Sequence, residues 1–344
     1  MGEAVPWRRA MADALYGADG FFTRTNQPGG SGAHFRTSAR ASELFATAIM
    51  RVVVAADEAL GGPDPFDVVD VGAGGGHLLR RLAELAPTRL AQRMRLSAVE
   101  LAPRPTDLPD AIGWSEQPPP AGSVTGVILA TEWLDNVPLD IAEVNEHGQL
   151  RYVLVDPWSG AESKGGELSR FDAAWAEQWW TDAPWEPGVR VELGAPRDAA
   201  WASAVAYLSR GVALTVDYGH MWYARPLTGT LTGFYGGRCA ATIPDGSRDI
   251  TAHVAIDAVC AAGETVAERP AVLTTQREAL GALGLSGARP PLELASTDPA
   301  GYVKALSAAT QAAELMDADG LGSHYWVAQP VGLDAGALPA GLRD

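Results

Sequence analysis

The sequence predicts an α/β fold with a mainly parallel β-sheet, helices on both of its faces, an inserted subdomain and an N-terminal extension. One supporting observation is that short apolar, β-branched runs alternate with stretches of helical periodicity along most of the chain. A second is the stretch of residues 66–77, where such a run leads into a glycine turn and then into a helix beginning at Leu78. The pattern changes after residue 139, which indicates the insertion.

The N-terminal part of the chain predicts two helices joined by a glycine-rich loop. The first helix covers residues 7–16, and the loop over residues 16–34 is either a lid or a disordered segment. Thr37 or Ser38 is expected to cap the second helix, which has one apolar face and ends at the glycine pair of residues 61–62. This helix is expected to lie against the sheet.

Strands and helices then alternate. Residues 265–273 are predicted to form an edge strand or a loop, because Pro270 has no N–H to donate a hydrogen bond within a central strand. The tail beyond Gly332 is expected to be loose. After the strand that ends at Val71, further strands are predicted at residues 95–101, 111–115, 124–130, 211–217, 229–235 and 323–328, and helices at residues 198–208, 255–262, 275–283 and 299–317.

Residues 140–196 predict a subdomain of their own. Alternating stretches at residues 141–144 and 150–155 predict a β-hairpin, and residues 189–193 predict another strand. Four tryptophans between them form either a mini-core or part of a substrate wall: Trp175, Trp179, Trp180 and Trp185. The expected units are an N-terminal lid and helix (1–62), a nucleotide-binding core (63–139), the inserted substrate subdomain (140–196), the rest of the core (197–332) and the tail (333–344).

The composition is that of a globular protein of 344 residues, with 47% hydrophobic and 20% charged residues. The 26 basic and 42 acidic residues give a net charge of −16, which argues against nucleic acid and anionic membranes and fits a small-molecule substrate or a cationic partner. Cys239 and Cys260 form no disulfide framework or metal-ligand pattern, so we expect a cytoplasmic location. No apolar run approaches the roughly 18 residues of a membrane span, and residues 1–7 lack the apolar region of a signal peptide.

The glycine turn indicates the kind of cofactor. Gly72, Gly74 and Gly76 stand at every second position, unlike the G-x-G-x-x-G spacing of dinucleotide folds, and Asp70 stands just before the turn. This arrangement leaves room for the zwitterionic methionine moiety of S-adenosylmethionine (SAM) and none for a pyrophosphate. A glycine turn without a ligand is the alternative.

Glu100 is expected to bind the ribose of that cofactor. It ends the next predicted strand, 26 residues after Gly74, and a carboxylate there can accept from both ribose hydroxyls. The alternative is a solvated glutamate at the end of a strand. Trp114 is expected to stack on the adenine. The expected cofactor-binding residues are Thr37, Ser38, Asp70, Gly72, Gly74, Gly76, Glu100, Leu101, Trp114, Ser115, Thr131 and Glu132.

Glu132 and Asp135 follow the predicted strand of residues 124–130. Ligands of doubly wound sheets lie at the carboxyl ends of the strands, so both acids are directed at the place of the transferable methyl group. The alternative is that Asp135 caps the next helix and Glu132 is solvated. His253 and Tyr218 are further candidates to line the acceptor pocket, although a lone histidine or tyrosine is often only structural.

Several segments, in the same order along the chain, resemble a known family. The family is that of the MidA-type SAM-dependent methyltransferases, relatives of the mitochondrial complex I assembly factor that methylates arginine. The resemblance lies in residues 14–22, 33–38, 42–45, 72–76, 131–138, 217–219, 249–254 and 275–276. It implies a class I methyltransferase (Rossmann-like) fold and in-line transfer of a methyl group to a guanidino nitrogen of a protein or peptide, with Glu132 and Asp135 gripping the guanidinium and His253 and Tyr218 lining its pocket.

Four positions depart from the family pattern and leave the acceptor open. His34, Arg40, Gly75 and Thr131 stand where the family has Asp, Glu, Arg and Asn. The first two changes remove acids that a cationic acceptor favours, so a small natural product is an alternative acceptor. A non-catalytic assembly factor that keeps SAM as a ligand, and a different nucleotide-binding enzyme, are further alternatives. The oligomeric state is left open as well, and a homodimer is one possibility.

Overall fold

The computed structural model describes residues 3–24, 38–180, 185–334, 336 and 338–343. A seven-stranded sheet forms the centre of the larger lobe, in the order β16-β17-β10-β5-β2-β3-β4. Neighbours from β10 to β4 are parallel, whereas β17 runs antiparallel to both β10 and β16. The strands are β2 (Phe66–Val71), β3 (Met94–Val99), β4 (Gly113–Ser115), β5 (Val124–Thr131), β10 (Leu208–Asp217), β16 (Val272–Thr275) and β17 (Tyr325–Val331). The predicted mainly parallel sheet is therefore confirmed.

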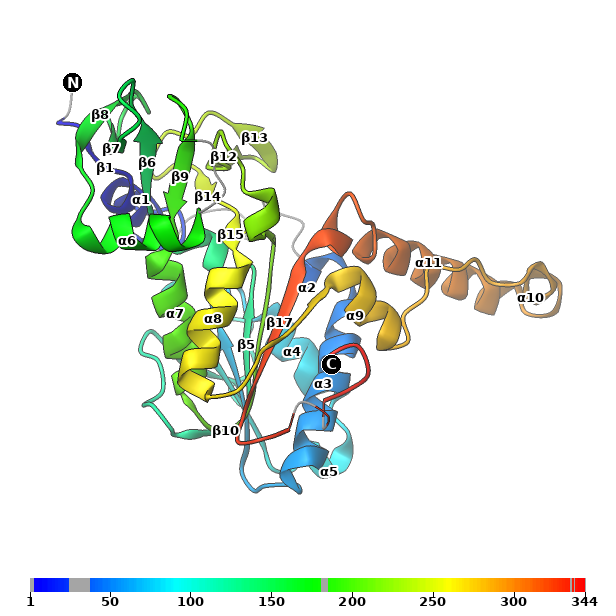
Figure 1. The fold of residues 1–344 in the computed structure, drawn as a ribbon. Coiled ribbons are helices and arrows are strands. Elements are labelled where there is room, and N and C mark those ends of the chain that lie inside the picture. Colours follow the sequence, from blue (N-terminus) through cyan, green and yellow to red (C-terminus); the bar gives the residue numbers. More distant parts are fainter. Residues whose placement is uncertain (1–2, 25–37, 181–184, 335, 337, 344) are drawn as a thin grey trace.

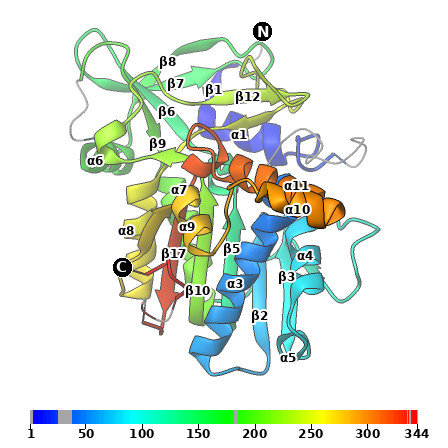
Figure 2. The ribbon, with the colours of Figure 1, turned by 90° about the vertical axis from the view of Figure 1, so that its right-hand side faces the viewer.

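Helices cover both faces of this sheet, as Figures 1 and 2 show. Successive strand residues alternate between two cores, because side chains of a strand point to opposite faces. Val68 and Leu129 belong to one core, and Val69 and Ile128 belong to the other. The first core is covered by α3 (Glu43–Leu60), α4 (His77–Leu85) and α9 (Gln276–Ala282), and the second by α7 (Ala195–Ala206) and α8 (Ile256–Ala267). A short helix, α5 (Thr88–Ala91), precedes β3.

The cap of the long helix α3 differs from the prediction. Ser42 is its N-cap, and the Ser42 hydroxyl accepts a hydrogen bond from the Leu44 N–H at 3.0 Å. Ser38 instead begins a separate short helix, α2 (Ser38–Ala41), and Thr37 lies outside the described residues. The local sequence offers several Ser and Thr residues that can cap a helix, so periodicity alone did not select among them.

A second lobe lies at the carboxyl edge of the main sheet (Figure 2). Its sheet has the order β1-β7-β6-β9, with β8 paired to β7. The strands are β1 (Val5–Pro6), β6 (Asp140–Val144), β7 (Leu150–Val155), β8 (Glu162–Glu167) and β9 (Arg190–Leu193). The predicted hairpin and the strand after it are confirmed, but β8 and the helix α6 (Arg170–Trp179) were not predicted.

The N-terminus belongs to this second lobe. Val5 pairs with Val155, and Trp7 of α1 (Trp7–Tyr16) is buried in the same cluster as Ile141 and Val153. The expected N-terminal unit of residues 1–62 is therefore divided, because its first helix packs on the insertion and its last helix on the main sheet. The predicted lid falls largely on residues outside the described part of the chain.

The tryptophans of the insertion build a core. Trp175 and Trp180 are buried with Ala142 and Val191, which favours the mini-core interpretation for these two. Trp185, in contrast, is 38% exposed.

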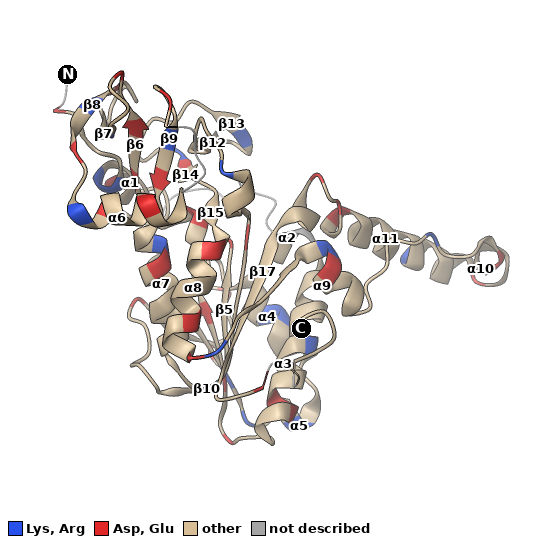
Figure 3. Cartoon of the chain, in the orientation of Figure 1, with Lys and Arg blue, Asp and Glu red and all other residues tan. Residues whose placement is uncertain are grey.

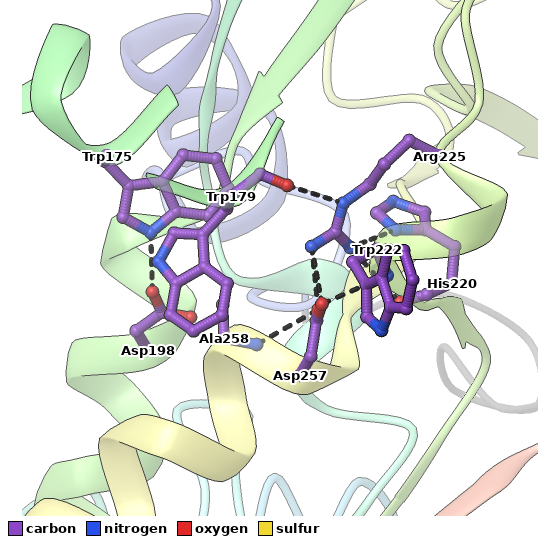
Figure 4. Close-up of polar contacts among 8 residues, drawn as sticks. All are labelled: Trp175, Trp179, Asp198, His220, Trp222, Arg225, Asp257 and Ala258. Atoms are coloured by element: carbon purple, nitrogen blue, oxygen red, sulfur yellow. Dashed lines mark hydrogen bonds and ion pairs between the residues drawn. The ribbon is translucent and has the colours of Figure 1, made fainter. Parts of the chain in front are cut away.

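Arg225 ties this core to the main lobe (Figure 4). Its guanidinium lies 4.6 Å from the centre of the Trp180 ring and donates to both carboxylate oxygens of Asp257, on α8, at 2.8 Å. It also donates to the Trp179 carbonyl at 2.9 Å and lies 2.8 Å from Nδ1 of His220. The buried guanidinium of Arg225 therefore joins α6 and α8 to the short helix η3 (Trp222–Ala224), which ends just before Arg225.

The remaining elements complete the second lobe and an arm. Helices α10 (Leu292–Thr297) and α11 (Pro299–Leu315) project from the body (Figures 1 and 2).

The tail was expected to be loose, but Leu333, Leu338 and Leu342 are buried in the first core. The small sheets contain β11 (Gly219–His220), β15 (Val254–Ala255), β12 (Thr232–Tyr235), β13 (Arg238–Ala240) and β14 (Asp249–Thr251).

Acidic and basic residues are interspersed over both lobes, as Figure 3 shows. The acidic excess of the sequence is thus spread over the fold. Within the described part of the chain, no helix combines the length and the apolar character that crossing a membrane would need.

Candidate functional site

A cavity of about 580 Å³ lies at the carboxyl edge of the main sheet. Such volumes are typical of small-molecule sites, and this edge is where doubly wound sheets bind ligands. Its walls come from the turn after β2, the ends of β3 and β5, and the second lobe. The residues used below that line it are Tyr16, Phe22, Asp70, Gly72, Gly74, Glu100, Leu101, Thr131, Glu132, Asp135, Tyr218, Phe234, Asp249 and His324.

The glycine turn brings its backbone close to this cavity. Gly72, Gly74 and Gly76 all have left-handed backbones, with φ of 70°, 55° and 70°. A Cβ on Gly72 would lie 2.5 Å from Cδ1 of Trp133, whereas a Cβ on Gly74 would meet nothing within 4 Å. The turn therefore needs glycine for its conformation, and the space beside Gly74 is free for a ligand.

Two acids flank the turn. The Gly74 N–H donates to Oε2 of Glu100 at 2.7 Å, and the Ala102 N–H donates to Oε1 at 2.8 Å. Burial raises the pKa of Glu100. Burial, and then the charge of Glu100, raise the pKa of Asp70 to about 8. Oδ1 of Asp70 is buried without a hydrogen-bond partner among the described residues, which is the position expected for a carboxylate that receives a ligand amino group.

Of the other residues predicted to bind the cofactor, some line the cavity and some do not. Leu101 and Thr131 line the cavity, but Trp114 and Ser115 lie outside its lining. The Trp114 indole N–H donates to the Ala102 carbonyl at 3.1 Å, and its ring lies beneath Gly76. Trp114 therefore supports the turn from behind in this structure. The residues after it, Glu116 and Pro118, line the cavity in its place.

Glu132 projects from a strained position at the end of β5. Its φ is 49°, a left-handed value that is uncommon for residues other than glycine. The Glu132 N–H donates to the Val216 carbonyl at 2.7 Å, and Oε1 accepts from the Ser38 N–H at 2.7 Å. Burial, and next the charge of Asp135, raise the pKa of Glu132 to about 8. The Glu132 side chain is only 13% exposed, so Glu132 is a largely buried residue of the cavity wall and not a solvated one.

Asp135 lies beside Glu132, in the short helix η2 (Leu134–Asn136). The Tyr218 hydroxyl donates to Oδ2 of Asp135, while Oδ1 has no partner among the described residues. The residue at the cap of η2 is Trp133, and it makes no side-chain cap bond. The alternative interpretation, in which Asp135 only caps a helix, therefore does not apply. Burial raises the pKa of Asp135.

A buried frame holds these acids in place. Arg197, which is 1% exposed, donates to the main-chain carbonyls of Asp135 and Val137 and to those of Ala252 and His253. Oδ2 of Asp217 accepts from the Asp135 N–H at 3.3 Å and from the N–H of the preceding residue at 2.9 Å. Neither role was predicted. The available signals were that Asp217 ends a predicted strand at the ligand-binding edge and belongs to a segment that resembles the family.

The part of the cavity formed by the second lobe combines acids with aromatic rings. Asn136 donates to Oδ1 of Asp249 at 2.7 Å, and burial raises the pKa of Asp249 to about 8. The rings of Tyr16 and Phe22 stack with centroids 5.6 Å apart. Phe234 completes the wall. A flat cation fits such surroundings, because carboxylates and ring faces both attract it.

Two histidines line this cavity, His77 after the glycine turn and His324, and neither is the predicted one. His253 lies outside the lining and packs edge-on against Tyr218, with centroids 5.1 Å apart. His324 lines the cavity, and its Nδ1 is 4.0 Å from Oε1 of Glu132. Burial lowers the pKa of His324 to about 4. Its position follows from β17 being antiparallel, which puts the residue before that strand at the ligand edge, and sequence alone gives no strand direction.

These features define a class of protein. A sheet with one antiparallel strand beside five parallel ones, a glycine turn after β2 and an acid at the end of β3 form the fold of class I SAM-dependent methyltransferases. The free space at Gly74, the unpartnered Oδ1 of Asp70 and the carboxylate of Glu100 fit an amino acid linked to a nucleoside. Within the described ranges, no group of three or more potential ligands is arranged to hold a metal ion.

Comparisons with known proteins agree with this class. The sequence model of the family described as "Putative S-adenosyl-L-methionine-dependent methyltransferase" matches residues 48–272. A "likely methyl transferase" from Burkholderia thailandensis, bound to S-adenosyl-homocysteine, is 24% identical with a TM-score of 0.77, over 98% of this chain and 90% of that chain. A native structure from the same superfamily and organism is 25% identical with a TM-score of 0.77, over 99% and 90% of the two chains. The search of curated proteins found no match.

The family match covers well over half of the chain, so this chain belongs to that family of SAM-dependent methyltransferases. It is an enzyme whose cofactor is S-adenosylmethionine. The two Burkholderia structures show that the fold extends over nearly the whole chain.

Proposed function

We propose that this enzyme methylates a guanidino nitrogen of an arginine in a protein or peptide. The observation that carries the proposal is the group of three carboxylates in the cavity wall, of which Asp135 and Asp249 are buried and Glu132 is largely buried. Burial raises the pKa of each, and a cationic acceptor beside them would favour their ionised forms. Arg197, the buried cation behind them, uses its donors on main-chain carbonyls.

The shape of the walls favours a planar cation. A guanidinium has five N–H donors in a rigid fork and can be gripped by carboxylates while its faces stack on aromatic rings. Tyr16, Phe22 and Phe234 offer such rings beside Asp249. The resemblance to MidA-type enzymes, whose mitochondrial relative methylates arginine, supports the same acceptor.

The chain's own residues do three things in this reaction. Glu100 and Asp70 are placed to hold the ribose and the amino group of SAM, which supplies a methyl group bound to a sulfonium. Glu132 and Asp135 orient the acceptor and attract its charge. Burial of the site keeps water away, so that alignment and proximity provide most of the acceleration.

The test uses SAM with a deuterated methyl group and three acceptors. These are an arginine-containing peptide, the same peptide with lysine in place of arginine, and free agmatine as a small guanidino compound. We expect mass spectrometry to find the label on the arginine peptide only. Label on agmatine alone would favour a small-molecule acceptor. SAM binding without transfer to any of the three would contradict a guanidino acceptor and agree with a non-catalytic role.

A variant connects the result to the site. Glu132→Gln keeps the size of the side chain and removes its charge, and Glu84→Gln on the surface of α4 is the matched control. We expect the first to reduce arginine methylation by about 100-fold or more, as the loss of a buried charged hydrogen bond does. The control should keep the wild-type rate.

A further inference from the structure

We propose that His324 is a catalytic residue, which accepts the proton that the acceptor atom loses during methyl transfer. The proposal rests on methyl transfer as the reaction, and it does not depend on the acceptor being arginine. Its basis is the position of His324 in the cavity, facing Glu132 across 4.0 Å.

The topology places His324 at the reacting end of the cavity. Tyr325, the first residue of β17, pairs with Asp217, the last residue of β10. Because β17 is antiparallel, the residue before it lies at the same edge as the residues that follow β5 and β10. Glu132 and Tyr218 are those residues, and the Tyr218 and His324 rings have centroids 5.4 Å apart.

One nitrogen of the His324 imidazole makes no hydrogen bond within the described part of the chain. The residue is 8% exposed, and its Nδ1 is buried without a partner among the described residues. Its main chain is fixed, since its N–H donates to the Leu321 carbonyl and its carbonyl accepts from the Gln276 N–H at 2.7 Å. A buried polar side chain on a rigid support, with no partner, is expected to serve a ligand.

The groups that face the ring determine which nitrogen acts. Nδ1 lies 4.0 Å from Oε1 of Glu132, so an Nδ1–H there would be attracted to an ionised Glu132, and Nε2 is then the nitrogen with a lone pair that can accept a proton. Tyr218 and His253 are the other titratable neighbours, and the charge of His253, after burial, lowers the pKa of His324. The ring is therefore neutral at pH 7 and able to accept a proton.

The step balances without any further reactant. The acceptor atom forms a bond to the methyl carbon while the bond from that carbon to sulfur breaks, and the electron pair of the broken bond stays on sulfur. The acceptor atom gains positive charge as it loses electron density. The proton it carries passes to Nε2 of His324, and the resulting imidazolium is stabilised by the Glu132 carboxylate.

The test uses the binding of two cofactor analogues to the full chain and needs no acceptor. S-adenosyl-homocysteine has nothing at the methyl position, whereas sinefungin carries a protonated amine there. We expect the wild type to prefer sinefungin, since its N–H can donate to Nε2. His324→Gln should bind S-adenosyl-homocysteine with unchanged affinity and lose about tenfold of that preference, as the loss of one charged hydrogen bond predicts.

Two controls make the outcome decisive. His147→Gln, at the exposed turn of the β6–β7 hairpin, should keep the full preference. His324→Asn replaces the first variant if that one fails to bind S-adenosyl-homocysteine. In ¹⁵N-histidine spectra, the His324 ring nitrogens should shift with sinefungin and not with S-adenosyl-homocysteine.

An unchanged preference in the His324 variants, or equal ring shifts with both analogues, would overturn the proposal. Failure of arginine peptides to become methylated would instead contradict the proposed acceptor and leave this result standing.

Discussion

The Gly74 N–H donates to Oε2 of Glu100 at 2.7 Å, so the glycine turn and the acid of the next strand form one unit. The same carboxylate accepts from the Ala102 N–H through Oε1. Each oxygen keeps a further lone pair for a ribose hydroxyl. Glu100 is thus oriented for the cofactor before the cofactor binds, and this preorganisation saves part of the entropy of binding.

We expect Glu100→Gln to weaken the binding of S-adenosyl-homocysteine by about 10- to 100-fold, which corresponds to about 1–3 kcal/mol. The amide group would place a donor where the Gly74 or Ala102 N–H, or a ribose hydroxyl, needs an acceptor. Isothermal titration calorimetry measures the change, with Glu84→Gln as the control. Equal affinities of Glu100→Gln and the wild type would remove Glu100 from the ribose site.

We expect SAM binding to release protons between pH 7 and 7.5. Burial raises the pKa of Asp70 and of Glu132 to about 8, so both are largely protonated in the empty site. The amino group and the sulfonium of SAM favour the ionised carboxylates and lower both pKa values. Calorimetry in buffers of different ionisation enthalpy counts the protons.

Two comparisons test whether the released protons come from Asp70 and Glu132. Asp70→Asn should release fewer protons on SAM binding, and S-adenosyl-homocysteine, which lacks the sulfonium charge, should release fewer than SAM. A binding enthalpy that is independent of the buffer would show that the acids are already ionised in the empty site.

We expect the free enzyme to lose stability as the pH rises from 6.5 to 8. The pKa values of Asp70, Glu132 and Asp249 are raised from ordinary values of 3.8 to 4.5 up to about 8, so the folded state binds more protons than the unfolded state in between. The stability from these groups is therefore present at low pH and lost as the pH passes through 8. Urea denaturation should show a decrease of about 2 kcal/mol from each of the three groups.

The histidines set the lower limit of this pH window. Burial lowers the pKa of His220 to about 3 and that of His324 to about 4, so the unfolded state binds more protons than the folded state below pH 6.5. Their effect has the opposite sign and ends near pH 6.5. Asp70→Asn should reduce the slope above that pH, and a slope equal to that of the wild type would show that Asp70 is not protonated in the folded state.

The sequence predicted the sheet, and it placed the glycine turn and Glu100 at the same edge of that sheet, because both features depend on local patterns. Buried strands, alternate glycines and an acid at the end of a strand are recognised within a few residues of each other. The parts that were missed depend on contacts between distant segments. Val5 pairs with Val155, and His324 reaches Glu132 only because β17 is antiparallel. Arg197 was missed because its partners are main-chain carbonyls, which leave no pattern in the sequence.

We expect Arg225→Met to destabilise the protein by about 3–5 kcal/mol, because Asp257 would keep a buried charge without its partner. Replacing both residues, with Asp257→Leu in addition, should recover part of this loss, since no unpaired charge remains. Arg238→Met, at an exposed position on β13, is the control and should change the stability little. Urea denaturation followed by tryptophan fluorescence measures all three variants, and the buried Trp180 beneath the guanidinium reports on this junction. If the single variant were as stable as the control, the ion pair would not hold the insertion against α8, and the packing of Trp175 and Trp180 alone would join the two lobes.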